Sequence, residues 1–411
     1  MRYVKDLACI KCGLQYSPDS SCYLCSCGGL LEVRYDYDLL RLEWDRDSLA
    51  ENSDFSMWRY LPLLPVGPFS KRSPLHIGWT PVYKSSALAK AIGLQRPVWV
   101  KDEGLNPTGS LKDRASAVAV VKAVEAAATT VACSSSGNAA SSLAGNIAAM
   151  GGSMQAVTFV PARAPQGKIA QILIYGAKVI SVQGSYREAF ELSVATIERW
   201  GWYNGNAAIN PYLIEGKKTA VLELAEQLNW QMPDWLVLPV GDGCTIAGAG
   251  KALRELKELG FIDKIPRLLG VQAAGCAPIY LAFSTGNELM PAEENTLADS
   301  IAAGVPRNPL KAIKEIQSSN GFMVAVEDEE ILEALRLMGR TCGIFAEPSS
   351  AAGLAGLARA VRQGLLAADS EVALISTGNG LKDVASALKA ASHPLRVLPD
   401  IHRLSAVVEE K

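Results

Sequence analysis

Short runs of β-branched and other apolar residues alternate along the chain with longer stretches, rich in Ala and Leu, whose apolar positions recur at helical spacing. The apolar runs predict strands at 97–101, 130–134, 154–160, 178–182, 235–240, 267–272 and 372–376. The stretches between them predict helices at 115–128, 139–150, 186–200, 217–229 and 329–342. Because strands that alternate with helices form parallel sheets covered on both faces, the pattern predicts an α/β fold.

Two segments show neither pattern. Residues 52–81 contain several Pro and Trp residues and predict an ordered but irregular connection rather than a flexible linker. The stretch after Ala391 is polar and is expected to pack loosely. The sequence has no internal repeat and no low-complexity segment.

The 411 residues are enough for about two or three domains. The 40 Lys and Arg residues nearly balance the 42 Asp and Glu residues, so the net charge is −2 and nucleic acid is not expected as a partner. No apolar stretch reaches the roughly 18 uninterrupted residues of a membrane span. The first residues lack the apolar core of a signal peptide, so we expect a soluble, cytoplasmic protein without membrane association.

Histidine is scarce, and its scarcity excludes some chemistry. The chain has only His76, His393 and His402, and the last two lie in the polar C-terminal stretch. A Ser-His-Asp triad or a histidine-rich metal centre would need more histidines than these. Proton transfer is therefore expected from a lysine, a carboxylate or a cofactor.

Five of the nine cysteines gather near the N-terminus. Cys9 and Cys12 form one closely spaced pair, and Cys25 and Cys27, followed by two glycines, form a second, with Cys22 and Cys25 as an alternative pairing. Two such pairs about a dozen residues apart can enclose a tetrahedral zinc ion. We expect a small structural zinc ribbon with Cys9, Cys12, Cys25 and Cys27 as ligands; a ribbon that has lost its metal remains the alternative.

One lysine stands where a purely structural lysine is unusual. In the segment 101–114 a strand ends in a loop broken by Gly and Pro, and a helix follows for which Ser110 is a natural N-cap. Lys112 then falls in the first helical turn, where the helix dipole disfavours a cation. A lysine whose charged form is disfavoured is a candidate to form a Schiff base.

Three further loops follow predicted strands, at the position where open α/β sheets bind ligands. Residues 134–139 offer successive hydroxyl and N–H groups that could bind a carboxylate. Residues 240–248 are rich in Gly and could let the backbone approach an anion, although they lack the Gly-Lys-Ser/Thr ending of a Walker loop and fit a dinucleotide fingerprint poorly. Residues 376–383 follow the last strand.

Pyridoxal phosphate chemistry would use all four segments together. This cofactor needs a lysine, a phosphate-binding site and a partner for its pyridine nitrogen. A neutral hydroxyl as that partner would leave the nitrogen largely unprotonated, which suits elimination and replacement at Cβ or Cγ better than transamination.

The chain resembles the threonine synthases, which belong to the fold-type-II pyridoxal phosphate enzymes related to tryptophan synthase β. The resemblance extends from Cys9 to about Ala391, and members of this family also often carry the N-terminal cysteine pairs. The matching segments, in chain order, are 101–114, Ser-Ser-Gly-Asn at 135–138, 210–219, 347–351 and 377–383.

The resemblance implies a two-domain α/β fold with twisted parallel sheets covered by helices, preceded by the cysteine-rich ribbon. The expected division is 1–35 for the ribbon, 36–105 with 210–395 for a discontinuous large cofactor-binding domain, 106–209 for a small domain, and 396–411 for a C-terminal tail. A homodimer is expected, because members of the family are commonly dimers.

The resemblance also implies roles for single residues. Lys112 would form the Schiff base with pyridoxal phosphate and then move protons at Cα and Cβ of the substrate. Asn138 would hydrogen-bond the ring hydroxyl of the cofactor, and Thr377 would face the pyridine nitrogen. The cofactor phosphate would be surrounded by Gly241, Asp242, Gly243, Cys244 and Thr245. The α-carboxylate of an amino-acid substrate would bind at Ser134, Ser135 and Ser136. Glu347 would lie near the cofactor or would only cap a helix.

Several positions depart from the family pattern. Threonine synthases bind the phosphate of O-phosphohomoserine with an Arg in the Asn-Pro-x-Arg segment, and here that position is Leu213. At three nearby positions where family members have polar residues, this chain has Ala139, Ala207 and Ala208. In addition, Asp242 replaces a usual Asn. Losing an Arg and neighbouring polar groups removes charge-assisted bonds that a phosphate dianion needs.

Three functions follow. The first is a threonine synthase whose phosphate contacts come from other residues, such as Lys217, Lys218 or Arg163. The second is a related lyase on a smaller or unphosphorylated substrate, for example a threonine or serine ammonia-lyase or a β-replacement enzyme, which the apolar residues just named would suit. The third is a binding protein without catalysis, against which the retention of Lys112, Asn138 and Thr377 argues.

Overall fold

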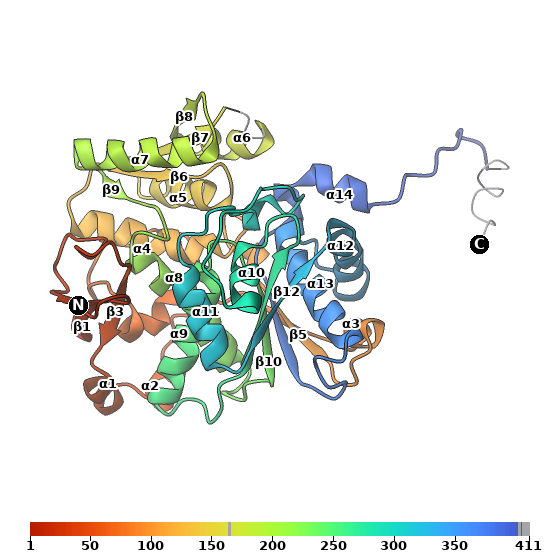
Figure 1. Cartoon of the computed structure of the whole chain (residues 1–411), viewed down its shortest axis with the longest axis horizontal. Coiled ribbons are helices and arrows are strands. Elements are labelled where there is room, and N and C mark those ends of the chain that lie inside the picture. The colour runs from red at the N-terminus through yellow and green to blue at the C-terminus, as the bar shows by residue number, and fades with distance from the viewer. Residues whose placement is uncertain (163–165, 402–403, 405–411) are drawn as a thin grey trace.

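The computed structural model describes residues 1–162, 166–401 and 404, and its strands form three sheets (Figure 1). The N-terminal sheet is antiparallel, in the order β2-β1-β3, with β1 (Val4–Cys9), β2 (Gln15–Tyr16) and β3 (Leu31–Tyr35). It is followed by α1 (Tyr37–Glu43), α2 (Arg46–Ala50) and the 3-10 helix η1 (Met57–Leu63).

The largest sheet has six strands in the order β12-β11-β10-β13-β5-β4. Its strands are β4 (Val82–Ser85), β5 (Val98–Asp102), β10 (Trp235–Pro239), β11 (Arg267–Ala273), β12 (Phe322–Val326) and β13 (Val372–Ser376). All neighbours are parallel except the edge strand β4, which pairs antiparallel with β5.

Helices cover both faces of this sheet, as expected for a parallel sheet buried on two sides. Successive residues of β10 point to opposite faces: Leu236 and Leu238 join one apolar cluster and Val237 joins the other. The first cluster includes residues of α8 (Tyr212–Gln227), α9 (Cys244–Glu258), α10 (Pro278–Thr285) and α11 (Pro309–Ser318). The second includes residues of α3 (Ser86–Ile92), α12 (Asp328–Cys342), α13 (Pro348–Arg362) and α14 (Val384–Ala390).

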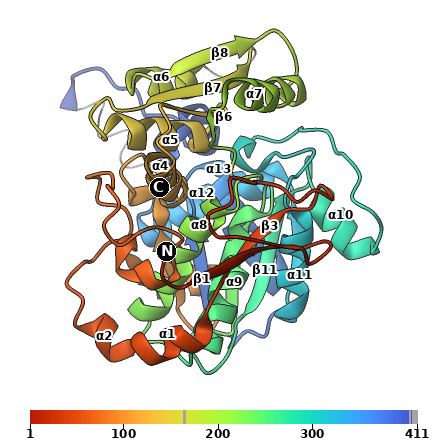
Figure 2. The same cartoon turned by 90° about the vertical axis from the view of Figure 1, so that its left-hand side faces the viewer.

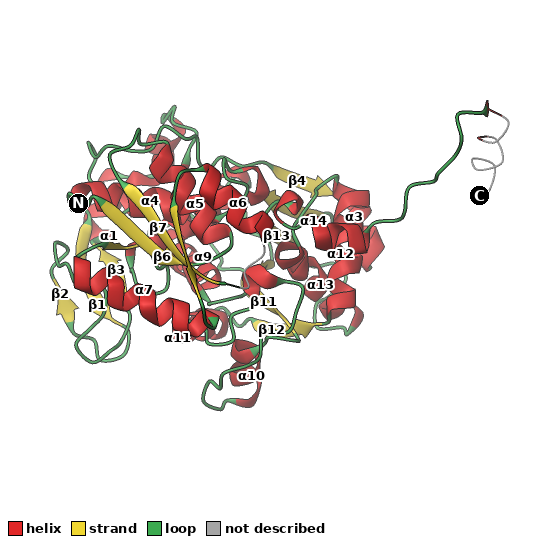
Figure 3. Ribbon diagram, turned by 90° about the horizontal axis from the view of Figure 1, so that it is seen from above, coloured by secondary structure: helices red, strands yellow, loops and turns green. Residues whose placement is uncertain are grey.

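The third sheet has four parallel strands in the order β8-β7-β6-β9 and lies at the top of Figure 1. Its strands are β6 (Thr130–Ser134), β7 (Gln155–Pro161), β8 (Lys178–Val182) and β9 (Tyr203–Asn204). The helices between and around them are α4 (Lys112–Glu125), α5 (Asn138–Ala148), α6 (Gln166–Ile174) and α7 (Tyr186–Trp200). Three short 3-10 turns complete the described elements: η2 (Glu103–Leu105), η3 (Asp299–Ile301) and η4 (Gly380–Lys382). After α14 the chain extends away from the body, as seen from above in Figure 3.

Each strand predicted from the apolar runs is present within one or two residues of its predicted bounds, and the α/β fold is confirmed. Within the two larger sheets, the pattern missed β12, an apolar run of five residues, and the short strands β4 and β9. The N-cap prediction was wrong in detail. Helix α4 begins at Lys112 with Leu111 at the N-cap position and no side-chain cap, so Lys112 does lie in the first turn but Ser110 does not cap the helix.

A group of fully buried charges joins α4, α8 and the end of β5. Arg114 donates to both carboxylate oxygens of Glu103, at 2.6 and 2.7 Å, and to Glu223 at 3.0 Å. The Lys101 ammonium donates to Glu223 at 2.6 Å. Burial by itself would raise the pKa of Glu223, but the positive charges of Arg114 and Lys101 lower it to about 2. Both carboxylates are therefore ionised, and two cations balance two anions.

The N-terminal sheet is attached to the body through its strand β3, and Figure 2 shows β1 and β3 in front of α9 and α11. Lys251 on α9 donates to the carbonyl of Val33 at 2.6 Å, and Lys311 on α11 donates to the carbonyl of Leu31 at 2.7 Å. Lys251 also forms a buried ion pair with Glu215 on α8. The two lysines thus connect the backbone of β3 to the helices beneath it.

In the described part of the chain, no helix combines the length and the apolar character that crossing a bilayer requires.

Glu223→Gln is expected to reduce stability by about 3–5 kcal/mol, because it leaves two buried cations with a single carboxylate. The effect is measured as a lower midpoint of urea unfolding. The contribution of Glu223 is present above pH 4.5 and is lost as the pH falls towards about 2, because its folded-state pKa is lowered. The control is Glu371→Gln, which removes an exposed pair with Arg96 (2.6 Å) and should cost less than about 1 kcal/mol. Equal effects of the two variants would contradict the argument.

Candidate active site

A pocket lies at the carboxyl ends of strands from both parallel sheets. The segments that follow β6, β10 and β13 line it, together with the first residues of α4 and α13. Four of the segments identified in the sequence therefore meet here. The predicted residues that line this pocket are Lys112, Ser134, Ser135, Asn138, Gly241, Asp242, Gly243, Cys244, Thr245, Glu347 and Thr377. Ser136 lines an adjoining pocket that also contains Lys112 and Asn138.

Lys112 is partly accessible through the pocket and otherwise surrounded by protein. Its amino group has no hydrogen-bond or ion-pair partner among the described residues. Removal from water, followed in importance by the positive charge of Lys217, lowers the pKa of Lys112 to about 8. About a tenth of the amine is therefore neutral at pH 7, far more than for an ordinary lysine, and the neutral amine is the form that acts as a nucleophile or a base.

The turn before Lys112 is fixed by the neighbouring Asp113. The Asp113 carboxylate accepts bonds from the N–H and the hydroxyl of Thr108, both at 2.7 Å, and from the hydroxyl of Ser142 on α5 at 2.8 Å. On the other side of the turn, the Leu111 N–H donates to the carbonyl of Thr377 at 2.9 Å. Bonds from α5 and from the end of β13 thus fix the backbone that presents Lys112.

Ser134, Ser135 and Ser136 lie in the turn between β6 and α5. The Ser134 N–H donates to the side-chain carbonyl of Asn206 at 2.9 Å, and the Ser134 hydroxyl donates to the carbonyl of Phe159. The Ser135 hydroxyl accepts from the N–H of Gly137 at 3.2 Å. The turn is therefore ordered by its own bonds.

Asn138, the first residue of α5, donates from its amide nitrogen to both carboxylate oxygens of Glu347, at 2.8 and 3.0 Å. Glu347 stands at the N-cap position of α13, but its side chain makes no capping bond and faces the pocket instead. Burial raises the pKa of Glu347, and the bond from Asn138 opposes that rise. The Glu347 side chain therefore does not cap the helix and lies in the pocket beside Asn138.

The Gly-rich loop leads into the N-terminus of α9. Gly243 has φ +88° at the N-cap position, and a Cβ there would lie 2.6 Å from the carbonyl oxygen of Asn308, so only glycine fits. No side chain caps this helix, and its first N–H groups are free to bind an anion. The Asp242 carboxylate accepts from the Arg307 N–H at 3.1 Å and is thereby turned toward the loop that precedes α11.

Thr377 follows β13 and is 9% exposed. Its N–H donates to the Ser350 hydroxyl at 2.7 Å, and that hydroxyl is 2.9 Å from the hydroxyl of Ser376. The side-chain hydroxyl of Thr377 lines the pocket without a partner among the described residues, so it is available to a ligand.

The sequence reasoning gave no role to four polar residues of the pocket: Asn206, Ser300, Arg307 and Ser349. Asn206 precedes the family segment, and its amide nitrogen is buried without an acceptor. The Arg307 guanidinium lies 4.1 Å from the centre of the Phe190 ring. Nothing in the sequence indicated that Asn206 would lie in the pocket, because it meets the end of β6 only through tertiary packing.

The residues considered as substitutes for the missing Arg differ in whether they line the pocket. Lys217 lines the pocket and is buried. Lys218 does not, because its ammonium is paired with Glu215 and Glu255 in the core. Arg163 lies outside the described residues. Leu213 is buried in an apolar cluster beneath the small sheet and is not among the residues lining the pocket, whereas Ala139, Ala207 and Ala208 are.

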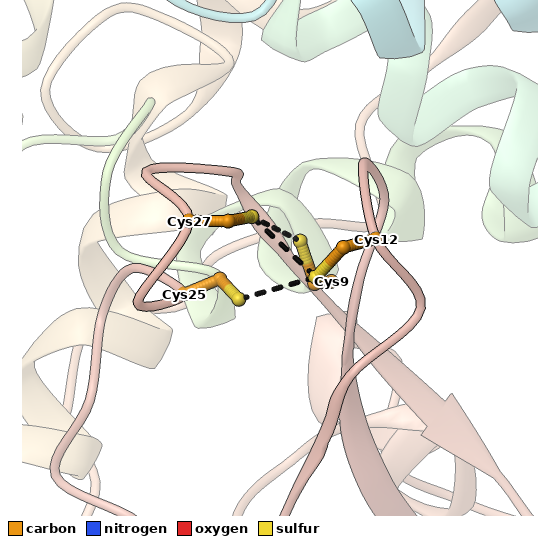
Figure 4. A group of neighbouring side chains, drawn as sticks. All are labelled: Cys9, Cys12, Cys25 and Cys27. Atoms are coloured by element: carbon orange, nitrogen blue, oxygen red, sulfur yellow. Dashed lines mark hydrogen bonds between the residues drawn. The ribbon is translucent and has the colours of Figure 1, made fainter.

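Four cysteines at the N-terminus form a compact group (Figure 4). The sulfur atoms of Cys9, Cys12, Cys25 and Cys27 all lie within 4.8 Å of one another, with separations of 3.4 Å (Cys12 to Cys27), 3.5 Å (Cys12 to Cys25) and 3.6 Å (Cys9 to Cys27). Sulfur atoms around a tetrahedral zinc at about 2.3 Å lie about 3.8 Å apart, so the group fits that ion. Cys22 is exposed and outside the group.

The residues of the pocket also fit pyridoxal phosphate. An amine of lowered pKa, a helix N-terminus with free N–H groups and an unpartnered hydroxyl are the groups that its aldehyde, phosphate and ring nitrogen require. These groups come from segments that are far apart in the sequence but line one cavity.

Comparison with known proteins also points to pyridoxal phosphate as the cofactor. Residues 74–378 match the family described as pyridoxal-phosphate dependent enzyme. The chain is 39% identical over 405 residues to a threonine synthase of Methanocaldococcus jannaschii, covering 98% of this chain and 99% of that one. It is 40% identical over 408 residues to a threonine synthase of Methanosarcina acetivorans, covering 98% of both.

Solved structures share the fold at lower identity. Maize serine racemase has a TM-score of 0.65 at 24% identity, covering 76% of this chain and 91% of that one. Diaminopropionate ammonia lyase of Escherichia coli has a TM-score of 0.66 at 20% identity, covering 82% and 93%. The fold-type-II architecture and the resemblance to threonine synthases are thus confirmed. The chain belongs to the pyridoxal-phosphate dependent enzymes and, within them, is a homologue of the threonine synthases.

Proposed function

We propose that this enzyme converts O-phosphohomoserine and water into threonine and inorganic phosphate. The observation that carries the proposal is that relatives named threonine synthase match 98% of the chain, while the segments shared with that family surround the pocket that contains Lys112. The substitution at position 213 removes a cation, but Lys217 lies one helical turn further along α8 and faces the pocket.

The residues of the chain divide the work of this reaction. Ser134, Ser135 and Ser136 would bind the α-carboxylate of the substrate with their hydroxyl and N–H groups. The N–H groups at the start of α9 would bind the cofactor phosphate, and Thr377 would hydrogen-bond the pyridine nitrogen. Asn138 would bind the ring hydroxyl, which requires its amide to share or exchange its present bond to Glu347.

When bound, pyridoxal phosphate withdraws electrons from the substrate and thereby makes its Cα and Cβ protons acidic. Lys112 would take and return these protons, because its pKa of about 8 lets the amine change protonation state near neutral pH. Loss of phosphate from Cγ and addition of water at Cβ would complete the conversion.

A second candidate is an ammonia-lyase acting on threonine or serine. Ala139, Ala207 and Ala208 line the pocket where the family has polar residues, and an apolar wall favours a substrate without a distal phosphate. Both candidates use Lys112 in the same way, so the identity of the leaving group distinguishes them.

The test is a spectral titration of the cofactor-loaded enzyme with O-phosphohomoserine, O-phosphoserine, threonine and serine, with release of phosphate and ammonia assayed in parallel. We expect phosphate and threonine from O-phosphohomoserine. No reaction with O-phosphohomoserine, but ammonia and a 2-oxo acid from threonine or serine, would refute the proposal in favour of the second candidate.

Lys112→Ala is expected to abolish covalent attachment of the cofactor and to reduce turnover by several orders of magnitude, because it removes the amine to which the Schiff base is assigned. The measurement is the visible absorption band of the lysine-bound cofactor, followed by mass spectrometry after borohydride reduction. Lys389→Ala, at an exposed position on α14, is the control and should retain the band. A retained band in Lys112→Ala would contradict the assignment of this lysine.

We also propose that the N-terminal cysteine group binds one structural zinc ion per chain. Metal analysis of the purified protein should find about one equivalent, and Cys12→Ser or Cys27→Ser should lose it because each removes one of four thiolate ligands. Cys22→Ser should keep the metal, since that side chain lies outside the group. Finding no zinc in the unmodified protein, or losing it with Cys22→Ser, would refute this ligand set.

A further inference from the structure

Lys217 is a buried cation without a partner. It is 4% exposed, and it has no hydrogen bond or ion pair with any described residue. The other buried lysines in the described part of the chain all have partners: Lys101 with Glu223, Lys122 with Glu125, Lys218 with Glu215, Lys251 with Glu215, and Lys311 with the carbonyl of Leu31. Because an unpaired buried charge is costly, this exception indicates that a ligand supplies the missing anion.

Packing of α8 against α4 keeps this cation close to the catalytic lysine. Gly216, the residue before Lys217, approaches so closely that a Cβ there would lie 2.1 Å from the carbonyl oxygen of Arg114. The close approach brings Lys217 and Lys112 to one pocket, where the charge of Lys217 contributes to lowering the pKa of Lys112, after burial. Two like charges in one cavity are relieved by an anion between or beside them.

The carboxylates of the pocket do not supply that anion. The Asp242 carboxylate accepts from the Arg307 N–H at 3.1 Å, and Glu347 accepts from Asn138 at 2.8 and 3.0 Å. Neither forms an ion pair with Lys217 among the described residues. The negative charge must therefore come from outside the chain.

Asn206 provides a second unused donor in the same pocket. It is 6% exposed, and its side-chain carbonyl already accepts from the Ser134 N–H, but its amide nitrogen has no acceptor. The free N–H groups at the start of α9 lie in the lining of the same pocket. An ammonium, an amide and helix N–H groups together form a set of donors suited to an anion with several oxygen atoms.

We propose that Lys217 binds a phosphate dianion in this pocket, with the Asn206 amide as a second donor. The phosphate has two possible sources, the 5′-phosphate of the cofactor and the phosphate of the substrate. The second source rests on the function proposed above, whereas the first depends only on the cofactor.

The experiment compares the unmodified protein with Lys217→Gln, Lys217→Arg and the exposed-lysine control Lys314→Gln. In the first arm, the apoenzyme is titrated with pyridoxal phosphate and with pyridoxal, which lacks the phosphate, and the ratio of the two dissociation constants is taken. In the second arm, the cofactor-loaded enzyme is titrated with O-phosphohomoserine, with homoserine and with inorganic phosphate as a competitor.

Lys217→Gln is expected to reduce one of these phosphate preferences by about tenfold or more, the range of a lost charge-assisted bond. A reduction in the first arm identifies the cofactor phosphate as the ligand, and a reduction in the second identifies the substrate phosphate. Lys217→Arg keeps the charge and should retain more of the preference than Lys217→Gln, and Lys314→Gln should change neither arm.

Phosphate preferences of Lys217→Gln within about twofold of the unmodified protein in both arms would overturn the inference. Where Lys217→Gln does not accumulate as folded protein, Lys217→Met, which also removes the charge, is measured in its place. If the unmodified enzyme does not respond to O-phosphohomoserine, the proposed function fails, and the first arm still decides the inference by itself.

Discussion

The buried ion pairs of Arg114 with Glu103 and Glu223 are the constraint on which the site depends. Arg114 lies two residues after Lys112, and Glu223 lies six residues after Lys217, so the same pairs fix both lysines relative to each other. Two carboxylates and two cations in direct contact tolerate little displacement, since a lost partner leaves an uncompensated charge in the interior. The geometry of the pocket is therefore set by groups that do not touch a ligand.

This arrangement also explains the electrostatics of the pocket. Burial favours the neutral amine of Lys112, and the nearby charge of Lys217 acts in the same direction. The N-terminus of α9 adds further positive potential through its free N–H groups. Two lysines and an uncapped helix N-terminus thus give the pocket a positive potential that suits an anion.

The N-terminal sheet is connected to the same helices that form the pocket. The carbonyls of β3 accept from Lys251 on α9 and from Lys311 on α11, and the N-termini of these two helices lie beside the Gly-rich loop. The family match begins only at residue 74, yet both archaeal threonine synthases cover the N-terminal region as well. The N-terminal sheet thus precedes the part of the chain that the family match covers, and it packs directly on the helices beside the Gly-rich loop.

The sequence by itself determined the α/β class, seven strands of the parallel sheets, the cysteine group and the lysine that begins α4, because each of these depends on local periodicity or on short spacing. The family segments further indicated which loops would meet. The tertiary structure alone decided that Cys25 rather than Cys22 joins the group of four cysteines, that Leu213 packs in the core, and that Lys218 is paired with carboxylates while Lys217 is not. These outcomes depend on which residues, distant in the chain, meet when helices pack. The sequence alone does not distinguish the two lysines of α8. Lys218 meets Glu255, a carboxylate more than 30 residues away in the chain, whereas Lys217 faces an open pocket.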